Sequence, residues 1–153
     1  MSYTNRAPRP DEVDGRDYHF ISTEEFERIR DEGGFLEWFE VYGDLKGTPR
    51  VPIEEHLAAG DDVLVEIDVQ GALAIRDRLP DAYVVFVKAP SRDTQRARLR
   101  ERDAGGTSDA RLSKAEAEEQ LADRFDAVVV NDDVDRAVGE VVGLLEARRH
   151  QER

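Results

Sequence analysis

Two arginines lie three residues apart near the start of the chain, on a segment that proline stiffens. Residues 6–10 read Arg-Ala-Pro-Arg-Pro, and a residue that precedes proline is held in an extended conformation. A guanidinium group binds phosphate through two parallel hydrogen bonds, and an ordered backbone lowers the cost of presenting it. The segment is a candidate phosphate site, although a solvated surface loop has the same composition.

Two carboxylates, Glu37 and Glu66, stand near the ends of expected strands. A carboxylate in such a position can accept paired N–H donors, which the edge of a purine base offers. The alternative is that both side chains face water, and these residues alone leave the two interpretations open.

A third set consists of arginines that flank a glycine-bearing loop at residues 103–108. They are Arg92, Arg96, Arg98, Arg100 and Arg102 before the loop and Arg111 after it. Phosphoryl transfer requires cations that neutralise charge in the transition state, and arginines beside a loop can supply them. A helix whose charged face pairs with Asp and Glu would give the same pattern.

The elements that position these residues change character at about residue 60. Before it, Ser22 and Glu25 form a capping box that opens a helix, and Gly43-Asp44 is typical of a hairpin turn. We expect, in order, a strand at 17–21, a helix from 22 to about 32, strands at 35–42 and 46–50, and a short helix from Pro52 to Gly60.

After residue 60, apolar runs alternate with helical patterns. Residues 63–67 read Val-Leu-Val-Glu-Ile, a nearly continuous apolar run that is typical of a strand buried on both faces. Alternating strands and helices indicate a parallel sheet with right-handed crossovers. We expect further strands at 83–87 and 127–130, and helices at 69–79, 91–101, 110–123 and 134–148.

Composition narrows the class of protein. The chain has 153 residues and a formal net charge of −13, which argues against a general nucleic-acid binder because phosphate contacts require a basic face. It contains no cysteine and no apolar stretch near the ~20 residues of a membrane span. A cytoplasmic domain without membrane partner is expected. The 19 arginines against 3 lysines fit either a high-salt cytoplasm or a GC-rich genome.

Seven segments, in this order, resemble the guanylate kinase family. They are residues 2–10, 12–15, 17–20, 35–38, 47–49, 66–71 and 130–133. The resemblance runs from residue 2 to about 149. It implies phosphoryl transfer from ATP to GMP, giving ADP and GDP, with Mg²⁺ bridging the phosphates; the oligomeric state is not implied.

Carried over position by position, the resemblance gives candidate residues their roles. It implies that the GMP phosphate is bound by Ser2, Arg6, Arg9 and Tyr18. It implies that guanine is recognised by Glu37, Thr48 and Glu66, with Asp68 beside them at the end of a core strand. The implied catalytic arginines on the lid are Arg98, Arg102 and Arg111, and Asn131 is implied to lie near the adenine of ATP. No residue is assigned to a metal.

The implied fold is α/β. It is a parallel-sheet core like that of P-loop kinases, here without its first strand, P-loop and helix, with a small mixed or antiparallel GMP-binding insertion and a helical lid. The corresponding division assigns residues 1–5 and 61–153 to the kinase core, about 103–123 to the lid, and 6–60 to the GMP-binding subdomain.

Two departures from the family pattern stand out. The 153 residues contain no G-x-x-x-x-G-K-[ST] motif, whose backbone and lysine cradle the ATP phosphates. We therefore expect a truncated or inactive form that keeps the GMP-binding half; the alternative is a non-catalytic guanylate-kinase-like module that binds nucleotide or peptide. The second departure is Leu45-Lys46, where the family typically has Tyr-Tyr. Lys46 either supplies a point charge to the phosphate or marks a relaxed site.

Overall fold

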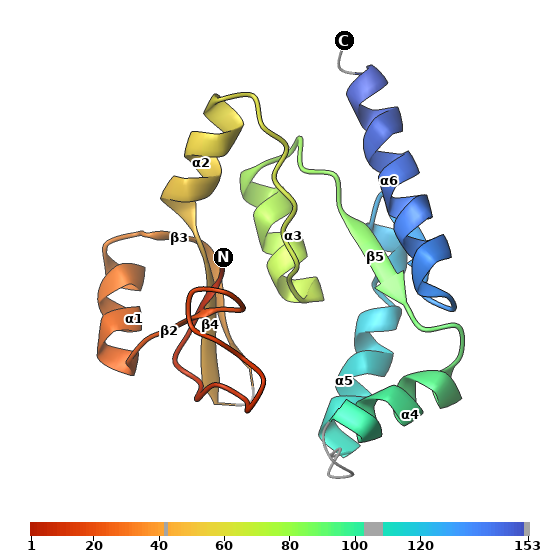
Figure 1. Ribbon diagram of the computed structural model, residues 1–153, viewed down its shortest axis with the longest axis horizontal. Coiled ribbons are helices and arrows are strands. Elements are labelled where there is room, and N and C mark those ends of the chain that lie inside the picture. The colour runs from red at the N-terminus through yellow and green to blue at the C-terminus, as the bar shows by residue number, and fades with distance from the viewer. Residues whose placement is uncertain (42, 103–108, 152–153) are drawn as a thin grey trace. The chain divides into compact units, whose positions relative to one another are not determined.

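The computed structural model describes residues 1–41, 43–102 and 109–151. It divides into two compact units, Met1–Ala82 and Tyr83–Arg153. Figure 1 shows the elements of both units in chain order, and each unit is described by itself.

The first unit is built on a four-stranded mixed sheet with the order β2-β1-β4-β3. The central β1 pairs parallel with β2 and antiparallel with β4, and β3 and β4 form an antiparallel hairpin. Gly43 in the hairpin turn has φ +86°, a conformation that favours glycine. The strands are β1 Tyr3–Thr4, β2 His19–Phe20, β3 Phe35–Val41 and β4 Asp44–Pro49.

Helix α1 (Thr23–Asp31) packs against β3 and supplies Phe26, a fully buried core side chain. Half of the predicted capping box forms: Ser22 Oγ accepts a hydrogen bond from the Glu25 backbone N–H at 3.1 Å, whereas the Glu25 carboxylate pairs with Arg28 at 2.7 Å. Phe26 is fully buried and stacks on Phe35 of β3, with ring centroids 4.5 Å apart. The Phe35 ring in turn lies over Gly47, where an added Cβ would lie 2.8 Å from Cδ1. The aromatic stack therefore fixes the helix against the hairpin.

Two further helices belong to the first unit. Helix α2 spans Arg50–Ala58, so it begins two residues before the predicted Pro52, because the extended Pro49 acts as its N-cap. Helix α3 spans Val69–Arg78 and packs against β3; its buried apolar side chains include Val69, Ala72 and Ile75.

The predicted buried strand at 63–67 is wrong. Residues 61–68 form neither helix nor strand, and Leu64 is 79% exposed. Val63, Val65 and Ile67 are half-buried while Leu64 and Glu66 are exposed, which is the alternation of an extended chain. A strand buried on both faces needs a hydrogen-bonded neighbour, and no strand in the described part of the chain pairs with this segment.

The second unit contains a two-stranded parallel sheet. Strands β5 (Val85–Lys88) and β6 (Ala127–Val130) pair in the register Val85↔Ala127, which confirms the predicted parallel pairing. The predicted helix at 110–123 ends earlier, and a short 3-10 helix, Ala122–Arg124, follows it. The helices are α4 Arg92–Arg102, α5 Asp109–Glu119 and α6 Val134–Gln151. The fold class is thus α/β, with one mixed and one small parallel sheet.

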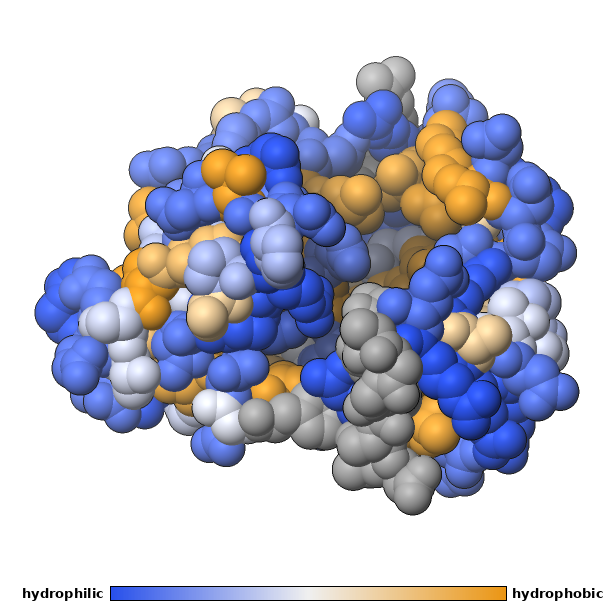
Figure 2. Space-filling view, turned by 60° about the horizontal axis from the view of Figure 1, so that its bottom comes forward, coloured by the Kyte–Doolittle hydropathy of each residue, from blue (hydrophilic) through white to orange (hydrophobic). Residues whose placement is uncertain are grey.

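Apolar side chains also reach the surface of this unit. On α6, four of them follow one face of the helix and are exposed: Val134, Val138, Val142 and Leu145. Figure 2 shows hydrophobic residues as separate patches on a surface that is otherwise mostly hydrophilic. Within the described ranges, no helix combines the length and apolarity that crossing a membrane requires.

Candidate functional site

The predicted site residues fall into the two units. Ser2, Arg6, Arg9, Tyr18, Glu37, Thr48, Glu66 and Asp68 belong to Met1–Ala82, and Arg98, Arg102, Arg111 and Asn131 belong to Tyr83–Arg153.

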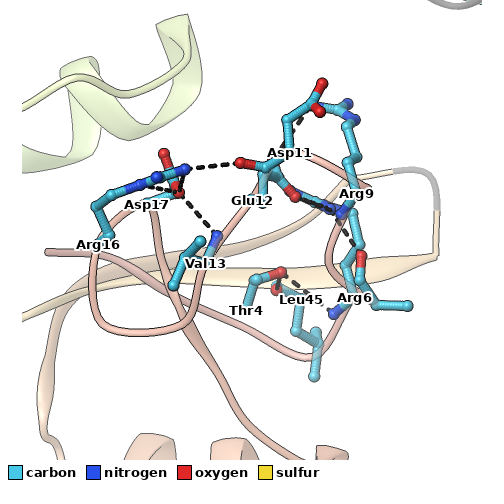
Figure 3. Close-up of polar contacts among 10 residues, drawn as sticks. Thr4, Arg6, Arg9, Asp11, Glu12, Val13, Arg16, Asp17 and Leu45 are labelled. Atoms are coloured by element: carbon cyan, nitrogen blue, oxygen red, sulfur yellow. Dashed lines mark hydrogen bonds and ion pairs between the residues drawn. The ribbon is translucent and has the colours of Figure 1, made fainter.

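The two predicted phosphate-binding arginines differ in how far they are engaged. Arg6 makes a bidentate ion pair with Glu12, with Nη1–Oε2 and Nη2–Oε1 distances of 2.7 Å, and both side chains are only 14% exposed. The Arg9 guanidinium is 50% exposed and only 3.5 Å from Glu12 Oε1. Figure 3 shows both arginines converging on this carboxylate. Arg9 is therefore open to a ligand, whereas Arg6 is already held.

Glu12 organises the loop between β1 and β2. Besides Arg6, its Oε2 accepts a hydrogen bond from the Arg9 backbone N–H at 2.7 Å. The Arg6 guanidinium and this N–H lower the pKa of Glu12 to about 2. Asp17 acts similarly on the other side of the loop, because its Oδ2 accepts from the Val13 N–H at 2.9 Å (Figure 3). Sequence reasoning assigned no role to Glu12; an arginine and a glutamate six residues apart in one loop is the signal that could have found it.

Tyr18 and Ser2 lie beside the two arginines' segment. The Arg6 guanidinium carbon is 5.4 Å from the centroid of the Tyr18 ring, and Lys46 Nζ is 5.8 Å from the same centroid. The Ser2 carbonyl accepts a hydrogen bond from the His19 N–H at 2.9 Å, which places Ser2 next to Tyr18. The residues predicted to bind phosphate thus lie near one another, and Lys46 lies beside Tyr18.

A buried carboxylate forms the second part of the site. Glu37 on β3 is 6% exposed and faces Thr48 on β4, whose Oγ1 donates a short hydrogen bond to Glu37 Oε1. Burial raises the pKa of Glu37, against the Thr48 hydrogen bond, which lowers it. A Cβ added to Gly71 of α3 would lie 3.2 Å from Glu37 Oε2, so the carboxylate sits close against the helix N-terminus because this residue is glycine.

Asp68 belongs to the same cluster, and Glu66 does not join it. Asp68 caps α3 by accepting from the Gly71 N–H at 2.9 Å, and its charge raises the pKa of Glu37. Glu66 is exposed and shows no hydrogen bond or ion pair with another residue of the described part. Glu37, Thr48 and Asp68 therefore stand together, and Glu66 remains open to solvent.

Arg78 supports Glu37 from the far end of α3. Its Nη1 donates to the Leu36 carbonyl and, at 3.4 Å, to the Phe35 carbonyl, and its positive charge lowers the pKa of Glu37. The guanidinium therefore ties α3 to the strand that carries the buried carboxylate. No sequence signal distinguishes Arg78 from other helical arginines of this chain.

In the second unit, Arg98 and Asn131 are brought together. Arg98 Nη1 donates to the Asn131 carbonyl at 2.8 Å, which links α4 to the end of β6. Arg111 is half-buried on α5, and Arg102 is the last residue of α4. The loop at 103–108, part of the predicted lid, lies outside the described residues.

Other arginines of α4 pair with a glutamate, as expected for a helix whose charged face forms ion pairs. Arg92 and Arg96 each approach Glu116 of α5, at 3.6 Å and 3.5 Å. These exposed pairs join the two helices and contribute little individually.

The described residues do not provide a metal centre of their own. Across residues 1–41, 43–102 and 109–151, no three His, Cys, Asp or Glu side chains are arranged to hold an ion. The Mg²⁺ that the resemblance implies is therefore given no protein ligand here. What the first unit does offer is a group of cationic side chains, Arg6, Arg9 and Lys46, and a buried carboxylate, Glu37.

Comparison with known proteins matches this arrangement to one family. A family model described as guanylate kinase matches residues 1–148. The chain is 49% identical to a guanylate kinase of Rubrobacter xylanophilus over 148 residues, which are 95% of this chain and 77% of the relative. It is 44% identical to a guanylate kinase of Thermus thermophilus over 153 residues, 99% of this chain and 70% of the relative.

A solved structure agrees with the sequence relatives. The crystal structure of guanylate kinase from Anaplasma phagocytophilum superimposes with a TM-score of 0.85 at 32% identity, covering 96% of this chain and 73% of the other. Sequence identity, family model and fold thus agree over nearly the whole chain. The chain belongs to the guanylate kinase family.

Proposed function

We propose that the first unit binds GMP. The observation that carries the proposal is the buried Glu37 carboxylate, which is hydrogen-bonded to Thr48. The loop between β1 and β2 of the same sheet carries Arg6, Arg9 and Tyr18. A nucleoside monophosphate carries the two matching groups, a base edge and a phosphate.

The buried carboxylate selects guanine by hydrogen-bond polarity. Glu37, with Thr48 donating to one of its oxygens, accepts from the N1–H and exocyclic amine of guanine. Adenine offers a lone pair at N1 instead, so the carboxylate would remain unpaired and desolvated. A site built around a buried hydrogen-bonding group therefore discriminates strongly against adenine. Glu66 is exposed and Asp68 lies at the same helix N-terminus, and both are assigned to the base side.

The second unit is assigned to the ATP side of the family reaction. Arg98, Arg102 and Arg111 are its candidate lid arginines, and Asn131 is its candidate adenine neighbour. The Arg98–Asn131 hydrogen bond supports a common site for these two. In the family reaction ATP supplies the phosphoryl group and Mg²⁺ the charge that bridges its phosphates. The mixed sheet is then a GMP-binding insertion on a kinase core, in a cytoplasmic protein.

Replacing Arg9 with alanine tests the phosphate assignment. We expect GMP binding to weaken by ~1–3 kcal/mol, because a charge-assisted hydrogen bond to phosphate is lost. Titration calorimetry with GMP measures the difference.

Arg28→Ala is the matched control, because Arg28 is 55% exposed, similar to Arg9, and pairs only with carboxylates of α1 and its cap. It should bind GMP as the wild type does. A wild type that does not bind GMP, or an Arg9→Ala variant that binds it equally well, would refute the proposal.

A further inference from the structure

Lys46 is a half-buried cation without an anionic partner. Lys46 lies on β4 opposite Thr4 of β1, and Thr4 is two residues before Arg6 in the chain. The Lys46 Nζ atom is 5.8 Å from the centroid of the Tyr18 ring. Across the part of the chain that the structure describes, Nζ makes neither an ion pair nor a hydrogen bond. A half-buried ammonium group without an ion pair or hydrogen bond lacks the interactions that normally compensate for the loss of hydration.

Both positive and negative side chains act on the Lys46 ammonium. Burial, then Arg6 and Arg9, lower the pKa of the Lys46 ammonium, while Asp68 on the α3 cap and Asp44 on its own strand raise it. Tyr18 is the remaining titratable group packed beside it. Arg6 and Arg9 share the Glu12 carboxylate, whereas Lys46 has no ion pair within the described residues. In a chain with a net charge of −13, such a convergence indicates an anion site.

We propose that Lys46 Nζ is a direct ligand of the GMP phosphate, acting together with Arg6 and Arg9. The inference rests on the proposed GMP site and adds a residue to it. A lysine brings a compact point charge on a flexible stem, so it follows the charge of the phosphate rather than a fixed bidentate geometry. Binding should therefore depend on the phosphate of the nucleotide through Lys46.

Calorimetry on Lys46 variants tests the assignment with two ligands, GMP and guanosine. We expect Lys46→Met to weaken GMP binding about tenfold or more and to leave guanosine binding unchanged, because only the phosphate contact is lost. Lys46→Arg should keep most of the affinity for GMP. Lys114→Met is the control, since it removes one positive charge from α5, where Lys114 pairs with Glu118.

The outcomes separate this inference from the proposed function. If the wild type binds GMP and Lys46→Met binds it equally well, the Lys46 assignment fails and the GMP site stands. Equal losses for GMP and guanosine would also overturn it, because they would mean a structural role. If the wild type binds neither ligand, both proposals fail.

The three lysines allow a second readout. Reductive ¹³C-methylation keeps the charge of each lysine and gives each an NMR signal, and Lys46→Arg identifies the signal of Lys46. GMP should raise the pKa of Lys46, because a phosphate dianion favours its charged form, whereas guanosine should not. An unchanged Lys46 pKa in the GMP complex would contradict direct contact.

Discussion

A Glu37→Gln variant is expected to bind GMP about a hundredfold more weakly than the wild type, without loss of thermal stability. The carboxylate is the only group of its kind buried between β3, β4 and the start of α3 in the described residues. Glutamine keeps the shape and one acceptor oxygen, but its NH₂ group faces a donor of guanine. Two charge-assisted hydrogen bonds are weakened, which corresponds to ~3 kcal/mol.

The stability expectation follows from the pKa of Glu37. Burial raises this pKa above its ordinary value of 4.5, so the folded state disfavours the ionised form. The resulting cost is absent at pH values below 4.5 and develops as pH rises from there to the raised pKa. Glutamine carries no charge at any pH, so the melting temperature of the variant relative to the wild type should be higher at pH 7 than at pH 4.

Glu40→Gln is the control for both measurements, because Glu40 lies exposed on the same strand. It should leave GMP affinity and the pH dependence of melting unchanged. Wild-type GMP affinity in Glu37→Gln would remove Glu37 from the base site. A variant that melts lower at pH 7 would show that the carboxylate stabilises the fold.

Replacing Phe26 with alanine should destabilise the first unit by ~3–5 kcal/mol. Phe26 is fully buried and stacks on Phe35 at 4.5 Å, so truncation removes its buried area and leaves a cavity between α1 and the hairpin. Urea unfolding measures the loss. Trp38 is the single tryptophan of the chain and lies on β3, so its fluorescence reports on this unit.

Leu57→Ala is the control for the core prediction, since Leu57 is an exposed apolar residue of α2 in the same unit. It should shift the urea midpoint far less. Equal midpoints for Phe26→Ala and the wild type would mean that the aromatic stack does not hold α1.

Local chemistry explains which elements were predictable from sequence. The Ser22 cap and the Gly43 turn depend on residues within a few positions of each other, and both are present, although Asp44 begins β4 and is not part of the turn. The hairpin register that sets Glu37 opposite Thr48 follows from that turn. The prediction for residues 63–67 was wrong because an apolar run shows only that the segment could be buried in a sheet. Whether another strand pairs with it depends on the tertiary structure.

The site shows the same division. Residue types near prolines and strand ends predict a phosphate site and a base site, and both stay predictions. The choice of Glu12 as the partner of Arg6, and of Arg78 as the support of β3, depends on loop and helix geometry across the fold. The Arg78 contact joins residues 42 positions apart, for which spacing in sequence is no guide, whereas Arg6 and Glu12 lie only six residues apart in one loop.

The extended segment at 63–67 also has a consequence for handling the protein. No strand of residues 1–41, 43–102 or 109–151 pairs with its backbone, and Leu64 is exposed, so a foreign strand can add there, which is the first step of amyloid-like association. Exposed Asp61, Asp62 and Glu66 surround and interrupt the run, as gatekeeper charges do in aggregation-prone sequences. Glu66 would then serve solubility as well as base recognition. A neutral substitution there is expected to promote self-association, so its effect on GMP affinity must be measured in dilute, freshly gel-filtered protein.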